Sequence, residues 1–343
     1  MKHNLLFFFV WFFTATFVFG QSAIAPQLDP RLYEIAKAPS AQRLEKDIRI
    51  LAGFGTRSTL SDTLSETRGI GAARRWIKAE FEKISKDCGG CLEVFYQRTL
   101  FKGGVNPRIP RDVWIVNVVA IQRGTRYTNR YVIMSGDIDS RPSNPSDGES
   151  DSPGANDNAS GMAGTIEAAR VLTKYKFLNS VIYVGLSGEE QGLIGGQYMA
   201  ENAKKDGWEI LGVLNNDMIG NIEGINGVID NRTFRIFSEP VPATETEQQR
   251  AWHRVYGGEV DGPSRQLARY VDKLTDLYTT NLDAMLVYRL DRFGRGGHHK
   301  PFNDLGFPGI RIMETWENYN RQHQNVRIED GIAYGDVIEG GQF

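Results

Sequence analysis

The sequence has few cysteines, almost no net charge and, after its first twenty residues, no long apolar run. It contains 2 cysteines in 343 residues, and 40 Lys and Arg side chains nearly balance 42 Asp and Glu, for a formal net charge of -2. Without excess positive charge there is no electrostatic case for binding nucleic acid or an anionic membrane surface. No segment after residue 21 is long and apolar enough to cross a membrane.

The first twenty residues differ from the rest. Lys2 and His3 precede the apolar stretch LLFFFVWFFTATFVFG, and Gln21 begins a polar segment. This order is typical of a secretory signal peptide that is cleaved before Gln21. Cleavage after Ala25 is an alternative that the following Pro26 disfavours. An uncleaved anchor is another alternative, although the run is short for the ~20 residues that a span needs. We expect an exported protein, periplasmic or extracellular, with no stable membrane association after cleavage.

The two cysteines, Cys88 and Cys91, are separated by two glycines. In an exported protein, this spacing favours one short structural disulfide. A thioredoxin-like redox pair is the alternative, and it needs a strand before the motif and a helix after it. The segment LEVFY that follows Cys91 is instead typical of a strand.

No internal repeat or low-complexity linker divides the chain. Residues 30–86 are mainly helical in pattern, and the stretch IGAARRWIKAEFEKISK has apolar residues at helical spacing. From residue 92, strands expected at 92–97, 113–121, 131–135, 180–186, 209–215 and 308–313 alternate with helices expected at 159–175, 191–205, 263–281 and 300–305. This alternation predicts one α/β domain over residues 21–343, with its core at 92–343. We expect a three-layer sandwich with a mixed, mainly parallel central sheet covered on both faces.

Acidic residues follow three of the expected strands and one loop. They are Asp137 and Asp139 after YVIMS, Glu189 and Glu190 after SVIYVGLSG, Asp217 after EILGVLNN, and Asp157 in PGANDNASG. Each alone is equally well explained as a turn or helix-cap residue. In an open α/β sheet, however, the carboxyl ends of the strands meet at the rim where ligands bind. Five or six carboxylates there need a cation, and oxygen donors with one histidine favour a divalent metal or a pair of metals.

Six motifs in order carry a resemblance to a known family: GDIDS, PGANDNASG, LSGEEQGLIGG, NNDMIG, HHKPFNDLGFPGIR and NYNRQHQ. From about residue 45 to the C-terminus, the chain resembles the secreted di-zinc aminopeptidases, family 28 of the metallopeptidases. The resemblance implies a phosphorylase/hydrolase-like α/β fold that binds two zinc ions. It also implies a peptide substrate with a free N-terminus, and it implies no partner protein.

The resemblance also implies a set of metal ligands. By position, Asp157 matches the carboxylate that bridges the two ions. Asp137 and Asp217 would complete one ion, and Glu190 and His323 would complete the other. The family commonly has histidine at the position of Asp137, so the ligand here is an oxygen. Zinc accepts it, and Mn²⁺ or Co²⁺ become possible substitutes.

Two further acids take catalytic positions in the resemblance. Glu189 matches the general base, which would take a proton from a water held between ions about 3.5–4 Å apart and pass it to the departing amine. Asp139 matches the acid that orients the first ligand. With Asp137 beside it, Asp139 needs a proton, a hydrogen-bond donor or a cation such as Arg141.

Other positions depart from the family pattern. The C-terminal ligand is often preceded by a tyrosine that stabilises the oxyanion, but here Gln322 precedes it and Tyr319 is the nearest tyrosine upstream. Either side chain is a candidate donor. His299 matches a histidine that lies near the site without binding metal, and His298 stands where the family has an acid.

Three alternatives remain open at this point. A glutamate-type carboxypeptidase of the same fold needs a basic cluster, for which Arg292, Arg295 and Arg311 are candidates. A single-zinc glutaminyl cyclase would lack a full two-metal ligand set. A metal- or peptide-binding homologue without catalysis is the third, and the retained Glu189 argues against it because binding alone needs no free base.

Overall fold

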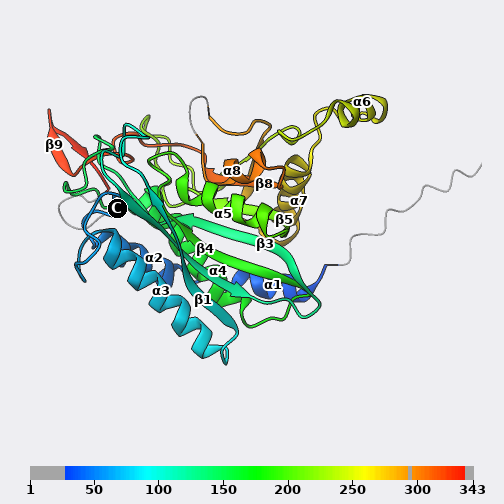
Figure 1. The fold of residues 1–343 in the computed structure, drawn as a ribbon, viewed down its shortest axis with the longest axis horizontal. Coiled ribbons are helices and arrows are strands. Elements are labelled where there is room, and N and C mark those ends of the chain that lie inside the picture. Colours follow the sequence, from blue (N-terminus) through cyan, green and yellow to red (C-terminus); the bar gives the residue numbers. More distant parts are fainter. Residues whose placement is uncertain (1–27, 293–295, 337–343) are drawn as a thin grey trace, which may run out of the picture.

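The computed structural model describes residues 28–292 and 296–336, and Figure 1 shows their fold. Eight strands form one sheet in the order β1-β2-β4-β3-β5-β8-β6-β7. They are β1 (Leu92–Phe101), β2 (Val113–Gln122), β3 (Tyr127–Asp137), β4 (Asn179–Leu186), β5 (Glu209–Asn216), β6 (Thr233–Ser238), β7 (Asp283–Val287) and β8 (Gly309–Glu314). The central pairings β4–β3, β3–β5 and β5–β8 are parallel, as is β6–β7, whereas β1–β2, β2–β4 and β8–β6 are antiparallel. The mixed, mainly parallel sheet is thus confirmed.

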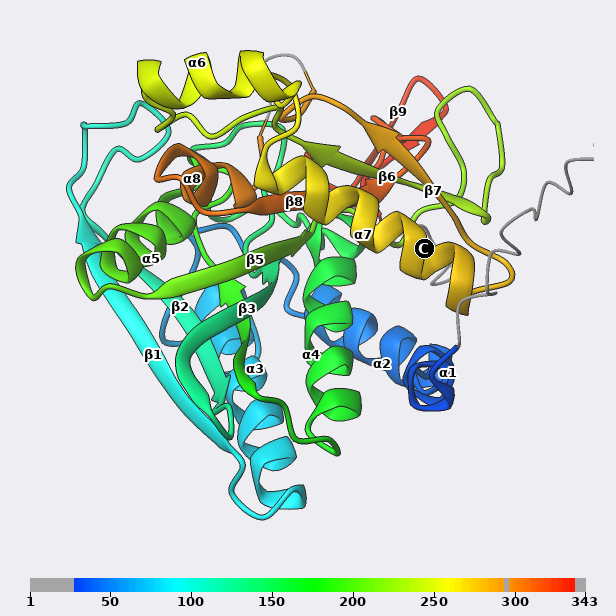
Figure 2. The ribbon, with the colours of Figure 1, turned by 90° about the vertical axis from the view of Figure 1, so that its right-hand side faces the viewer.

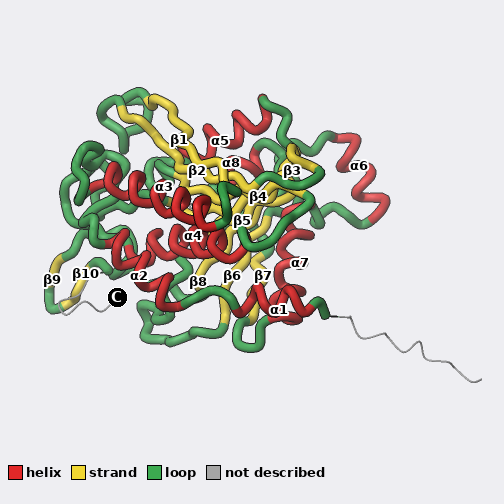
Figure 3. The backbone as a smooth tube through the Cα atoms, turned by 90° about the horizontal axis from the view of Figure 1, so that it is seen from below, coloured by secondary structure: helices red, strands yellow, loops and turns green. Residues whose placement is uncertain are grey.

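Helices cover both faces of this sheet (Figure 2 and Figure 3). One face carries α2 (Ala41–Ala52), α3 (Gly69–Asp87) and α4 (Gly161–Leu172), and the other carries α5 (Ile194–Lys205), α7 (Pro263–Tyr278) and α8 (His299–Asp304). Helix α1 (Pro30–Lys37) contacts α7, while α6 (Glu247–Tyr256) projects from the body in Figure 1. A small hairpin of β9 (Arg327–Glu329) and β10 (Ile332–Tyr334) follows. The expected three-layer sandwich is therefore present.

The two faces of the sheet arise from alternation along its buried strands. In β2, Val118 and Ala120 pack with α3 and α4, whereas Val119 and Ile121 pack in a second cluster with residues of α5 and α8. Successive side chains of a strand point to opposite faces, so a continuous apolar run serves both layers. This is why the central strands read as unbroken apolar segments in the sequence.

The expected strands and helices within residues 92–313 all occur, with ends that differ by a few residues. Strands β6, β7, β9 and β10 and helix α6 were not expected from the sequence. The β7 segment, DAMLV, has only five residues and lies at the sheet edge, so its side chains are only partly buried. A short edge strand of this kind lacks the apolar run that marks the central strands.

The disulfide is confirmed as a short link between α3 and β1. Cys88 and Cys91 are bonded, with their Cα atoms 5.6 Å apart, and the second cysteine is followed by a strand rather than a helix. Among the described residues, no helix is long and apolar enough to cross a bilayer. The expected signal peptide, residues 1–20, lies outside the described residues.

Glycines seat α4 against the strands that carry the site. A Cβ atom on Gly136, in β3, would lie 2.5 Å from the carbonyl carbon of Gly161 at the start of α4. One on Gly161 would lie 2.2 Å from the carbonyl oxygen of Asn216. Side chains are absent at both positions because backbone meets backbone there. The helix start, and the loop before it, is thereby held at the carboxyl ends of β3 and β5.

Candidate metal centre

The acids predicted from the sequence meet at the carboxyl ends of the parallel strands. Asp137 is the last residue of β3, Asp217 directly follows β5, and the loop after β4 carries Glu189 and Glu190. Asp157 lies in a π-helical turn, η1 (Ala155–Ser160), that leads into α4. Four segments far apart in sequence therefore deliver carboxylates to one rim, as expected for an open α/β sheet.

Three of the predicted ligands form a compact group. Ligand atoms of Asp157, Glu190 and His323 all lie within 4.8 Å of one another. The Nε2 atom of His323 is 3.0 Å from Oδ2 of Asp157 and 3.2 Å from Oε2 of Glu190. Both acids are buried, and the second oxygen of Glu190 has no hydrogen-bond partner. Two carboxylates and an imidazole are a donor set that suits zinc, and a buried carboxylate oxygen without a partner fits a cation.

The charges in this group are strongly coupled. Burial alone would raise the pKa of Asp157, but the adjacent His323 outweighs it and lowers the pKa to about 2. Burial likewise opposes the charge on His323, yet Glu190 and Asp157 raise the pKa of the imidazole to about 9. The site therefore attracts positive charge, and a metal ion bound there replaces the imidazole proton.

Glu189 lies beside the group without belonging to it. It lines a cavity of about 400 Å³, the metal cavity, together with Asp157, Glu190, Asp217 and His323. Burial and then the charge of Glu190 raise the pKa of Glu189 well above its ordinary value. A divalent ion nearby would favour the ionised form again. The carboxylate of Glu189 is thus placed to exchange a proton within the cavity.

Asp139 holds the turn that carries the base and a ligand. Its carboxylate accepts hydrogen bonds from the backbone N–H groups of Glu189 at 3.2 Å and Glu190 at 3.1 Å, and from the Thr59 hydroxyl at 3.1 Å. The required donors are therefore backbone amides and a hydroxyl. Arg141, the cation suggested from sequence, pairs instead with Glu190 at 2.9 Å.

Both carboxylate oxygens of Asp137 have partners from the protein. Oδ1 lies 2.5 Å from Nδ1 of His298, and Oδ2 accepts a hydrogen bond of 2.6 Å from the Asn158 side chain. Asp137 is 1% exposed, and it does not line the cavity. His298, which stands where the family resemblance has an acid, is therefore the direct partner of Asp137, which stands where the family has a histidine.

Asp217 faces a buried arginine. Nη2 of Arg311 lies 2.9 Å from Oδ2 of Asp217, an ion pair without the directionality of a hydrogen bond. Nη1 of the same guanidinium lies 2.9 Å from both oxygens of Asp291. Asp137 and Asp217 thus already have an imidazole and a guanidinium partner, respectively. Within residues 28–292 and 296–336, Asp157, Glu190 and His323 are the only set of three or more possible ligands whose ligand atoms all lie within 4.8 Å of one another.

Other predicted residues lie away from the cavity. Tyr319 is 49% exposed, the Gln322 amide donates to Glu317, and His299 contacts the carbonyl of Leu290. None of these three predicted residues lines the metal cavity. The basic residues that do line it are Arg108, Arg141, Arg292, Lys300 and Arg311. Arg295, a further candidate, lies outside the described residues.

Sequence reasoning missed the part that Asn158 takes in the site. Its Nδ2 donates to Asp137 and to the carbonyl of Asn216, while its Oδ1 accepts from the N–H groups of Gly161 and Met218. Asn158 thereby ties η1 to the ends of β3 and β5. Its position directly after Asp157 was the available signal, but an asparagine in a turn has many other uses.

Comparison with known proteins is consistent with this geometry. The sequence profile of peptidase family M28 matches residues 117–332, a segment that contains all the acids of the rim and His323. The chain belongs to peptidase family M28. A probable zinc metalloprotease of Leptosphaeria maculans is 41% identical over 324 residues, which cover 94% of this chain and 75% of the relative.

Solved structures share the M28 fold at low sequence identity. The LapA aminopeptidase of Legionella pneumophila aligns with a TM-score of 0.61 and 20% identity, over 88% of this chain and 69% of that one. A glutaminyl cyclase of Porphyromonas gingivalis aligns with a TM-score of 0.52 and 19% identity, over 82% of this chain and 85% of that one. At these identities, the alignments establish the fold that this M28 chain shares with both proteins.

Proposed function

We propose that this M28 chain is a zinc-dependent aminopeptidase that hydrolyses the N-terminal peptide bond of peptides. The observation that carries the proposal is the buried group of Asp157, Glu190 and His323, with Glu189 free beside it in the same cavity. The likeness to a solved aminopeptidase and the names of the curated relatives support the reaction class. A free base next to a ligand group is what hydrolysis requires and what binding alone does not.

In this proposal the side chains have separate tasks. Asp157, Glu190 and His323 would hold the ion, which when bound polarises a carbonyl and lowers the pKa of water at the site. Glu189 accepts the proton of the attacking water at its carboxylate and gives it to the departing amine. Asp139 fixes the backbone of this turn through the amides of Glu189 and Glu190.

The number of ions is a separate part of the proposal. The sequence predicts two zinc ions, the second of which would use Asp137 and Asp217 with Asp157 as the bridge. In the structure, His298 and Asn158 occupy the oxygens of Asp137, and Arg311 is paired with Asp217. A zinc–carboxylate bond of about 2.0–2.2 Å would bring a second ion close to this guanidinium. We therefore propose one tightly bound ion, with Arg311 as the fixed cation at the second position.

A glutaminyl cyclase is the second candidate, and the single ligand group favours it. A single-zinc cyclase needs only one ligand group, and a solved glutaminyl cyclase shares this fold. The two reactions are distinguished by product. An aminopeptidase releases a free amino acid from a peptide, whereas a cyclase acts on N-terminal glutamine and releases ammonia while the peptide bond stays intact.

Replacement of the base tests the proposal. We expect Glu189→Gln to lower kcat on aminoacyl-anilides by about 10²–10⁴-fold, the usual contribution of a general base, with zinc content unchanged by elemental analysis. Glu201→Gln, at an exposed position of helix α5, is the matched control and should retain full activity. Full turnover in Glu189→Gln would refute the mechanism. Cyclisation of a glutaminyl peptide without anilide release by the wild type would select the cyclase instead.

We also propose that the protein is exported, because of the apolar segment at its N-terminus. Expression of the full chain in a secreting host, followed by N-terminal sequencing of the product, tests this. A mature chain that begins at Gln21 is expected, and a chain that keeps Met1 inside the cell would contradict the proposal.

A further inference from the structure

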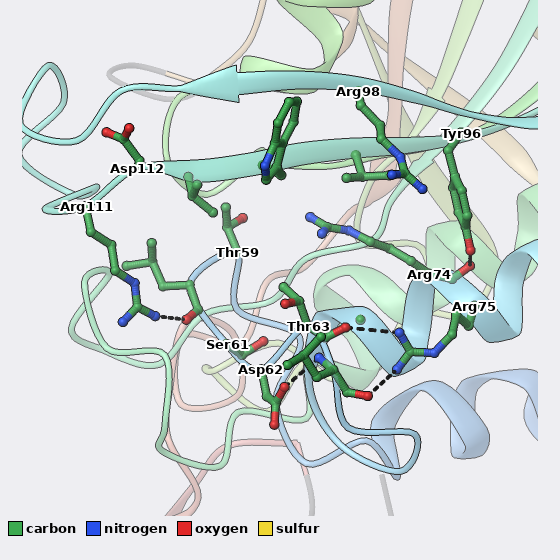
Figure 4. Close-up of a pocket in the computed structure, with 16 residues that line it drawn as sticks. Thr59, Ser61, Asp62, Thr63, Arg74, Arg75, Tyr96, Arg98, Arg111 and Asp112 are labelled. Carbon is green, nitrogen blue, oxygen red and sulfur yellow. Dashed lines mark hydrogen bonds between the residues drawn. The ribbon is translucent and has the colours of Figure 1, made fainter.

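A second, larger cavity lies apart from the metal cavity. It has a volume of about 690 Å³ and is bounded by segment 59–64, by the N-terminal half of α3 and by the β1–β2 hairpin. We call it the hairpin cavity, and Figure 4 shows its lining. It shares no lining residue with the metal cavity. The proposed peptidase reaction uses none of the residues that line the hairpin cavity.

Arg74 in α3 extends its guanidinium group into the hairpin cavity (Figure 4). The residue is 5% exposed, yet it forms no ion pair with a described acidic side chain, and its Nε has no hydrogen-bond partner. Among the described residues, its guanidinium makes one side-chain hydrogen bond, a long one of 3.5 Å from Nη2 to the hydroxyl of Ser187. A buried guanidinium with unused donors is costly unless an anion satisfies it.

Other buried arginines of this protein show what Arg74 lacks. The guanidinium of Arg57 donates to four backbone carbonyls, and that of Arg311 pairs with Asp217 and Asp291. Burial lowers the pKa of Arg74 to about 10, and the charge of Asp139, which forms no ion pair with it, opposes this effect. Arg74 therefore stays charged at neutral pH without a contacting counter-ion.

The walls of the hairpin cavity add positive charge. Arg98 lies over the Tyr96 ring and Arg111 donates to the carbonyl of Leu60, and neither forms an ion pair with a described acid. The two acids that line the cavity already have partners. Asp112 pairs with Lys102, and the Asp62 carboxylate accepts backbone N–H groups. Arg74 and Arg98 both line the hairpin cavity (Figure 4).

We propose that the hairpin cavity binds a small oxyanion, a carboxylate or phosphate-type group, through Arg74 and Arg98. Planar guanidinium groups match such oxygens in a two-pronged geometry. The cavity is larger than an isolated anion, and the aromatic side chains of Tyr96 and Trp114 in its wall would contact the remainder of the ligand. This inference does not depend on which reaction the metal cavity performs.

The hairpin cavity is connected to the turn that carries the catalytic base. Thr59 lines the cavity, and its hydroxyl donates to Asp139, which in turn accepts the N–H groups of Glu189 and Glu190. Ser187, the contact of Arg74, lies two residues before Glu189. The hairpin cavity and the turn that carries Glu189 are therefore linked through Thr59 and Ser187.

Calorimetric titration of the zinc-loaded full protein tests the proposal, with sulfate as a phosphate-type probe and benzoate as a carboxylate probe. Ionic strength is held constant with chloride. We expect saturable binding of at least one probe, weakened about tenfold or more in Arg98→Gln, since a charged hydrogen bond commonly contributes that much. The exposed Arg126→Gln variant, in the turn between β2 and β3 and outside the lining of the cavity, should bind as the wild type does.

The two probes identify the kind of anion, and the variants locate it. Arg98 is exposed, so its replacement tests the site without disturbing the fold, and Arg74→Gln, checked by circular dichroism and zinc content, extends the test to the buried group. Absence of saturable binding by either probe to the wild type would overturn the proposal. Binding that is equal in wild type and Arg98→Gln would also overturn it, because the anion would then lie elsewhere, at the metal cavity included.

Discussion

Single neighbours decide what each buried acid of the metal cavity can do. Asp157 and Asp217 are both nearly inaccessible carboxylates at the same rim. His323 beside Asp157 can give up a proton and become a ligand, whereas Arg311 beside Asp217 cannot lose its charge in a protein. The first carboxylate is therefore open to a metal ion, and the second already has a permanent cation.

This difference predicts the metal stoichiometry. We expect native mass spectrometry of the wild type in slight zinc excess to show one tightly bound ion. Arg311→Met combined with Asp291→Asn should allow a second ion, because it frees Asp217 without leaving Asp291 as an unpaired buried acid. Lys300→Met, which changes another cation of the cavity, should keep one ion. Two tight ions in the wild type would contradict the role given to Arg311.

A buried acid away from the metal cavity predicts a pH effect on stability. Burial raises the pKa of Glu239 to about 7, while the Ser264 hydroxyl only partly offsets it. Because the folded state holds this proton more tightly than the unfolded chain, Glu239 costs stability as pH rises from its ordinary pKa through about 7. Glu239→Gln should therefore raise the free energy of unfolding at pH 8 by about 1–3 kcal/mol and change it little at pH 4.5.

Urea unfolding at a series of pH values measures this difference. The gain of the glutamine variant over the wild type should grow between pH 4.5 and about 7.5 and then level off. Glu247→Gln on exposed helix α6 is the control and should give no pH-dependent gain. A constant difference at all pH values would mean that Glu239 has no raised pKa.

At the scale of elements, the seating of α4 sets the position of Asp157. The start of this helix touches the backbone of β3 and β5 through Gly136 and Gly161. Asn158 then bonds η1 to the same strand ends. The position of Asp157 is thus determined by contacts between elements rather than by the loop itself, and a small shift of α4 moves this carboxylate.

We expect Gly161→Ala to reduce both stability and zinc affinity. Its Cβ would lie 2.2 Å from a backbone carbonyl, and overpacking of this kind typically costs about 1–3 kcal/mol. Gly164→Ala, one turn along the same helix, is the control, because its Cβ would meet only the end of the Ile219 side chain at 3.1 Å. Thermal unfolding and zinc titration measure both effects. Equal behaviour of the two variants would show that the helix start tolerates displacement.

The elements themselves were largely predictable from sequence, for a physical reason. Strands β2 to β5 are buried on both faces, so they appear as apolar runs with turn residues between them. The strands β6 and β7 were missed because partial burial gives them mixed composition, as in TFRIFS and DAMLV. The order of the strands in the sheet depends on pairings across long stretches of chain, which local patterns do not contain.

The site was predictable only as far as positions along strands allowed. The acids of the rim meet at one edge as expected, because parallel strands bring their carboxyl ends together, whereas His323 was assigned only by the family resemblance. The pairings of Asp137 with His298 and of Asp217 with Arg311 join residues 161 and 94 positions apart, respectively. Nothing in the sequence near either acid indicates its partner, so these two pairings could not be predicted.

For the whole molecule, the metal ion links the catalytic rim to global stability. Zinc that binds the folded state alone stabilises it by about 2.7 kcal/mol at a free concentration 100 times Kd. We expect chelation to lower Tm and zinc to restore it, while His323→Ala, which removes a ligand, should respond to neither.

Because the pKa of His323 is about 9, zinc competes with a proton there. The zinc-dependent gain in Tm should therefore fall as pH is lowered from 9, and a pH-independent gain would contradict this assignment.

The early part of the chain is also part of the catalytic unit. Arg57 is fully buried and donates to the carbonyls of Leu51, Ile138, Pro153 and Gly154, which surround the loop before Asp157. Strand β1 pairs along its whole length with β2. Both lie before residue 117, where the family profile begins to match. The stretch that the family profile matches therefore takes part of its structural support from residues that precede it.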